Sequence, residues 1–87
     1  MAFKKDPNAT LDYSVDWTAW LGADTITAVT WVLSGGLSKV SQSHTPKIAT
    51  ILVSGGTVGA VETATCRITT AEGRVDDRTI TLNIVER

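Results

Sequence analysis

The segment VETATCRITTAEGRVDDRTITLNIV, residues 61–85, decides the fold class of this 87-residue chain. Apolar residues stand at every second position in both of its halves: Ala64, Cys66, Ile68, Ile80, Leu82 and Ile84. Successive side chains of a strand point to opposite faces of a sheet, so this period of two predicts two strands, each with one buried face. Gly73, between the halves, tolerates the positive φ that a tight connection needs. The segment therefore predicts a β-hairpin and an all-β chain.

Four earlier segments have strand-like patterns, at residues 11–18, 25–33, 37–42 and 48–53. Residues 25–33 are apolar on both faces, which favours a central or covered strand. The weaker segment 37–42 contains Lys39, which suits an edge strand. Six to seven short antiparallel strands with regular turns predict a single immunoglobulin-like β-sandwich. A small antiparallel barrel is the alternative.

The length allows one domain. Residues 1–10 are expected to form an extended N-terminal arm, because Pro7 disfavours a helix at Asp6. Residues 11–87 are expected to form the sandwich domain. The glycine pairs at 35–36 and 55–56 follow strands without a phosphate-binding motif, which indicates turns.

Charge and hydropathy exclude several kinds of partner. Eight Lys and Arg residues stand against nine Asp and Glu residues, giving a net charge of −1. This balance offers no basic surface for a nucleic-acid backbone. The sequence has no apolar stretch of membrane-spanning length and no apolar region of a signal peptide. We therefore expect a protein assembled in the cytoplasm that binds neither nucleic acid nor a membrane.

No catalytic residue, cofactor site or metal site is expected. Cys66 is the only cysteine and His44 the only histidine, too few for an ordinary zinc site. Cys66 lies in the apolar alternation and is expected to be buried, whereas His44 is expected in an exposed loop without the partners of a catalytic triad. Calcium is a weaker alternative, with oxygen ligands from Asp12, Asp16, Asp24, Asp76 and Asp77.

The three tryptophans are candidates for the core and for an interface. Trp31 and Trp17 follow the apolar alternation and are expected in the core. Trp20 lies where the alternation fails, just before a turn expected at residues 22–24. It is expected either to contact a partner or a sugar, or to cap the open end of the core.

Two stretches resemble a known family. They are KDPNATLDYSVDWTAWL at residues 5–21, followed by DTI at 24–26, and RITTAEGRVDDRTITL at residues 67–82. Both are similar to small immunoglobulin-like virion proteins of tailed phages, of the fiber–tail adaptor type. The resemblance covers nearly the whole chain and implies a structural role, with no catalytic residue carried over.

The resemblance implies a non-enzymatic phage virion protein that docks tail or baseplate to fiber through protein–protein contacts. Its implied partners are other phage structural proteins, in a symmetric multi-copy assembly located in the virion. We expect the arm and Trp20 to carry part of the contact, through Phe3, Lys4, Lys5, Pro7 and Trp20. The alternatives are a capsid or tail decoration protein, and a carbohydrate- or cell-surface-binding module.

Overall fold

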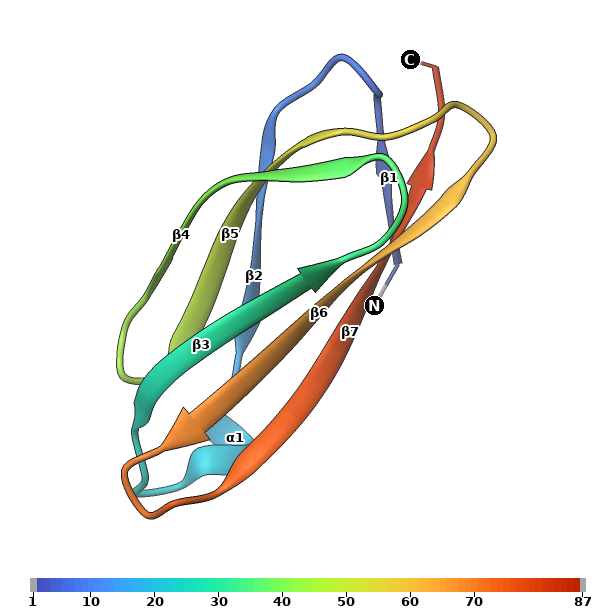
Figure 1. Cartoon of the computed structure of the whole chain (residues 1–87). Coiled ribbons are helices and arrows are strands. Elements are labelled where there is room, and N and C mark those ends of the chain that lie inside the picture. Colours follow the sequence, from blue (N-terminus) through green and yellow to red (C-terminus); the bar gives the residue numbers. More distant parts are fainter. Residues whose placement is uncertain (1, 87) are drawn as a thin grey trace.

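The computed structural model describes residues 2–86 and shows an all-β protein. Its described part contains seven strands and one short helix: β1 (Ala2–Lys5), β2 (Leu11–Asp16), α1 (Thr18–Leu21), β3 (Ile26–Leu33), β4 (Leu37–His44), β5 (Ile48–Gly55), β6 (Val61–Thr70) and β7 (Val75–Ile84). The strands form a four-stranded sheet of order β1-β7-β6-β3 and a three-stranded sheet of order β2-β5-β4. The two sheets enclose one core in an elongated body of 41 × 20 × 18 Å (Figure 1).

The hairpin predicted for residues 61–85 is confirmed. β6 and β7 pair antiparallel from Val61 opposite Asn83 to Thr69 opposite Val75. The core contains the six apolar residues of the alternation, together with inward-facing residues of the three-stranded sheet. The latter include Val15, Ala49, Ile51 and Val53, each at most 1% exposed. Cys66 is buried as predicted, and Trp17 and Trp31 also lie in the core.

The antiparallel pairing expected for the strands of residues 11–87 is confirmed, but residues 2–5 of the expected arm form an additional strand, β1. This strand runs parallel to β7, with Ala2 opposite Thr81 and Lys5 opposite Ile84. Residues 2–5 of the expected arm thus belong to the four-stranded sheet. Pairing of the chain's first and last strands needs no tight hairpin, so nothing in the local sequence at residues 2–5 signals it.

The interpretation of residues 25–33 as a central or covered strand is wrong as well. β3 is an edge strand, and Val32 on its outer face is 58% exposed. The register shifts between Ile26 and Ala28, which marks a β-bulge. The bulge inserts an extra residue and so shifts the alternation of side chains along β3. As a result, Ile26 and Val29 both face the core, although one is even-numbered and the other odd-numbered. By contrast, β4 is an edge strand as Lys39 indicated.

The two glycine pairs meet at one end of the sandwich. The N–H of Gly56 donates to the carbonyl of Gly36 over 3.1 Å, and a Cβ on Gly55 would lie 2.6 Å from the same oxygen. Gly56 has a φ of +111°, and a Cβ there would lie 2.7 Å from Cδ1 of Ile84. Gly59 in the same connection has a φ of +86°, but a Cβ on it would meet no atom within 4 Å.

These positions give a matched test of core packing. Gly59→Ala should destabilise the fold by about 1–2 kcal/mol, because its positive φ is strained for an L-residue. Gly56→Ala should cost roughly 1–3 kcal/mol more, since its methyl also pushes against buried Ile84. Chemical denaturation of the two variants measures the difference. Equal losses would contradict the close contact between residue 56 and Ile84.

Candidate interaction surface

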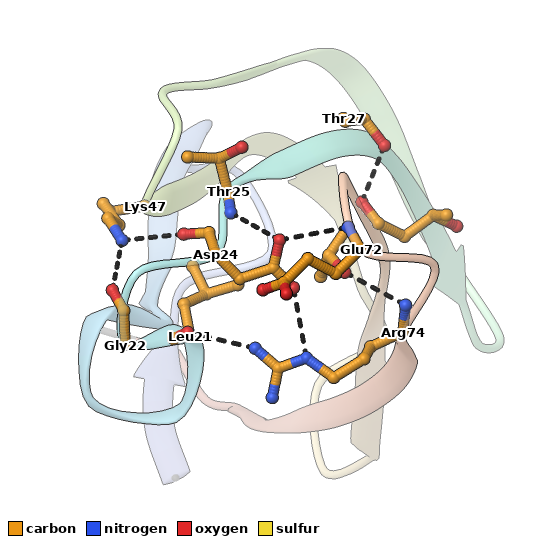
Figure 2. A network of polar contacts seen from close by, with 10 residues as sticks. Leu21, Gly22, Asp24, Thr25, Thr27, Lys47, Glu72 and Arg74 are labelled. Carbon is orange, nitrogen blue, oxygen red and sulfur yellow. Dashed lines mark hydrogen bonds and ion pairs between the residues drawn. The ribbon is translucent and has the colours of Figure 1, made fainter.

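A polar network ties together three connections at the end of the sandwich that carries α1 (Figure 2). Its centre is the buried Asp24, whose carboxylate accepts hydrogen bonds from the amides of Thr25 (2.8 Å) and Glu72 (3.2 Å). The guanidinium of Arg74 donates to the same carboxylate over 3.1 Å. Nζ of Lys47 donates to the carbonyls of Gly22 and Asp24, which adds the β4–β5 connection.

The network determines the charge state of Asp24. Burial of the carboxyl tends to raise its pKa, but hydrogen bonds outweigh this effect and lower the pKa to about 2. The donors, in order of effect, are the Thr70 hydroxyl, the Thr25 amide, the Arg74 guanidinium and the Glu72 amide. Asp24 is therefore a structural anion rather than a free ligand or a general base.

Trp20 lies half-buried at this end and packs against the core. Its ring is 5.4 Å from that of Trp17 in an edge-to-face arrangement, and the Arg74 guanidinium lies 4.3 Å from its centroid. Arg74 also donates to the carbonyl of Leu21 over 3.0 Å. Of the two roles expected for Trp20, these contacts favour capping of the open end of the core.

The other expected contact residues lie on β1 and just after it. Phe3 is 38% exposed and packs against Tyr13 in a tilted arrangement, with 5.1 Å between ring centroids. Lys4 is exposed and pairs in register with Asn83, and Pro7 is half-buried. β1 pairs with the last four residues of β7, whereas α1, which carries Trp20, lies at the opposite end of the sandwich (Figure 1). The structure therefore does not gather the expected set into one patch.

Lys5 is fully buried and has no exposed side chain to offer a partner. Its ammonium donates to the carbonyls of Gly55 (2.6 Å) and Asp6 (3.0 Å). Burial lowers the pKa of Lys5, although the nearby Asp6 opposes that shift. Lys5 therefore joins β1 to the end of β5 and has a structural role here.

The outer face of the four-stranded sheet is a solvent-facing surface that sequence reasoning missed. Its members are the outward-facing residues of β3, β6 and β7, and most are threonine or valine: Thr30, Val32, Val61, Thr63, Thr65, Thr69, Val75, Thr79 and Thr81. Among the outward-facing residues of β3, β6 and β7, only Arg67 and Asp77 are charged. They form an ion pair with two hydrogen bonds, of 2.8 and 3.1 Å. The signal was present in the sequence, because the polar half of the alternation is threonine rather than Lys or Glu.

The described residues form no pocket and no group of three His, Cys, Asp or Glu side chains that could hold a metal ion. Burial raises the pKa of the Cys66 thiol to about 11, so this cysteine stays protonated at neutral pH. His44 is exposed at the end of β4. Within residues 2–86, no helix is long and apolar enough to cross a membrane.

Fold and surface together define a small β-sandwich whose four-stranded sheet has an outer face without net charge. A family model described as "Podophage GP4 fiber-tail adaptor protein gp77" matches residues 5–83. Because this match covers most of the sequence, the chain belongs to that family of phage structural proteins. No curated protein matches the chain.

The lowered pKa of Asp24 predicts acid sensitivity with a defined window. An ordinary Asp in an unfolded chain has a pKa of about 3.9. Stability contributed by the Asp24 carboxylate is thus fully present above about pH 4 and is lost as the pH falls toward 2. Asp24→Asn should lower the melting temperature by several degrees at pH 7 and flatten the decline between pH 4 and 2.

Thermal unfolding between pH 2 and 7 measures both effects. Asp12→Asn, exposed on β2, is the matched control and should stay within ~0.5 kcal/mol of the wild type at pH 7. An unchanged acid profile in Asp24→Asn would show that the network does not depend on the carboxylate charge.

Proposed function

We propose that this chain is a non-enzymatic adaptor of the phage virion that docks tail or baseplate to fiber through protein–protein contacts. The observation that carries the proposal is the outer face of the four-stranded sheet. Charged residues are depleted at the centre of protein interfaces, and this face has one mutually neutralised pair among threonines and valines. The family of fiber–tail adaptors supplies the kind of partner.

The face suits docking for energetic reasons as well. β-branched side chains have few rotamers, so ordering them against a partner costs little conformational entropy. Three long strands spaced ~4.8 Å apart, with up to ten residues of ~3.3 Å each, give a face of roughly 500 Å². One partner of a specific complex commonly contributes ~800 Å². We infer that the full contact includes neighbouring elements, with Lys4 of β1 on the same side of the sheet as Asn83.

The immunoglobulin-like assignment is part of this proposal. Strands β2 to β7 follow the order of strands B to G in such domains, with B-E-D facing C-F-G. Buried Trp31 on β3 pairs in register with Cys66 on β6, which matches the core tryptophan and the F-strand cysteine of that fold. β1 would then be a first strand that joins the sheet of β7.

Two valines on opposite sheets provide the test. Val32 on the outer face is 58% exposed and Val40 on β4 is 55% exposed. Val32→Glu should reduce incorporation into particles at least about tenfold, because a docked partner would bury an unpaired charge. Val40→Glu should assemble like the wild type. Quantitative mass spectrometry of purified particles, with melting temperatures of both variants, gives the comparison.

The same spectra distinguish the two virion roles. A few copies per particle support an adaptor at the tail, and hundreds support a decoration protein. Normal incorporation of a folded Val32→Glu chain would refute docking through this face, and absence of the wild-type chain from particles would refute the virion role.

A further inference from the structure

β7 has an open edge along half of its length. The strand comprises Val75–Ile84, but β1 pairs only with its last four residues, from Thr81 to Ile84. On the side away from β6, no described strand accompanies residues 75–80. In Figure 1 this half of β7 forms the outer margin of the sheet, between β1 and the turn that leads in from β6. Six residues at ~3.3 Å each make an edge of about 20 Å, the length of an ordinary strand.

The backbone polarity of this edge follows from the hydrogen bonds at the end of β7. The N–H of Ile84 donates to Ala60, on the β6 side, whereas the N–H of Val85 donates to Lys5 of β1. Backbone groups alternate in direction along a strand, so the odd-numbered residues of β7 face the open edge. Val75, Asp77 and Thr79 therefore direct their N–H and C=O groups outward.

The carboxylate of Asp76 lies at this edge and restricts which strand can pair with it. The N–H of Asp77 donates to Oδ1 of the neighbouring Asp76 over 2.9 Å, so a side chain occupies one edge donor. Charged residues on an edge oppose indiscriminate strand addition. An incoming strand that pairs with Asp77 replaces this hydrogen bond. It must therefore place a positively charged side chain beside the Asp76 carboxylate.

We propose that a second copy of this chain occupies the edge, through antiparallel pairing of two β7 strands about a two-fold axis at Asp77. In this register Val75 lies opposite Thr79 of the second copy, and Asp76 lies opposite its Arg78. The two-fold axis repeats that ion pair on the other side. Asp76 and Arg78 would form non-hydrogen-bonded pairs, in which facing side chains approach most closely.

The charges of Asp76 and Arg78 favour this register over the two registers shifted to either side of it. Only registers that pair odd residues with odd residues align the free backbone groups. A shift in one direction sets Asp76 against Asp76, and a shift in the other sets Arg78 against Arg78. The central register sets Asp77 against Asp77, but Arg67 already neutralises each of these carboxylates.

In this arrangement the arginines beside the edge keep the contacts that they make within their own chain. Arg78 keeps its hydrogen bond of 3.1 Å to the Asp16 carbonyl and its stacking at 4.3 Å from the Trp17 ring centroid. Arg74 keeps its ion pair with Asp24. The contact is small, so we expect a reversible dimer that forms at high protein concentration. It needs no other virion protein, and its test is independent of the adaptor role.

A charge exchange tests the register. Asp76→Arg sets arginine against Arg78, and Arg78→Asp sets aspartate against Asp76, so each single variant should weaken dimerisation at least tenfold. The double variant restores opposite charges and should return the dissociation constant to within about threefold of the wild type, as expected for a directly facing pair. Lys39→Glu on β4 is the control and should leave dimerisation unchanged. Sedimentation velocity over a concentration series measures all five proteins, and thermal unfolding confirms that each is folded.

Amide hydrogen exchange of the wild type provides a second measurement, because loss of Arg78 uncovers Trp17 and can disturb folding. The Val75 and Thr79 amides should become protected as concentration rises, whereas those of Asp76 and Ile80, which face β6, should be protected throughout. A folded double variant that fails to recover would overturn the register. A wild type that remains monomeric with unprotected Val75 and Thr79 amides would overturn the proposal, and so would protection that appears only on addition of purified tail or fiber protein.

Discussion

The structure depends on the pleat of β6, the strand of the four-stranded sheet that pairs along its length with β7 on one side and β3 on the other. Its even-numbered side chains enter the core, where Ala64, Cys66 and Ile68 are at most 1% exposed. Its odd-numbered side chains form the middle of the outer face. Because the side-chain period of a strand is two, a slip of one residue would exchange these two sets. The same constraint that builds the core therefore determines the surface proposed for docking.

At both ends of the sandwich, buried polar side chains form hydrogen bonds that hold the loops between strands. At one end Asp24 holds the turn between β6 and β7 through Glu72 and Arg74. At the other end Glu62 accepts hydrogen bonds from the Ser34 hydroxyl and the Gly36 amide, and Lys5 donates to Gly55. A small domain buries a limited fraction of its apolar surface, so such satisfied contacts matter to its stability.

The sequence predicted the features that are encoded locally. The alternation in residues 61–85 predicted the hairpin, and Lys39 indicated the edge position of β4. The features it did not predict arise from distant partners or from insertions. β1 pairs with a strand almost eighty positions later, and Arg74, which packs on the Trp20 ring, comes from another turn. The bulge after Ile26 mixes the two faces of β3, so its apolar residues resembled those of a central strand. The outer face was missed because threonine was taken as the ordinary polar half of a strand.

The proposed docking face and the proposed dimerisation edge both include β7, so the two contacts are physically connected. The odd-numbered residues of β7 place their side chains on the outer face and their backbone groups on the open edge. Pairing of two β7 strands would therefore join two outer faces into one surface of roughly 1,000 Å², twice the area of a single copy. Such a surface reaches the contribution expected of one partner in a specific complex, which a single face does not. Self-association through the edge would thus strengthen docking through the face, although neither contact requires the other to form.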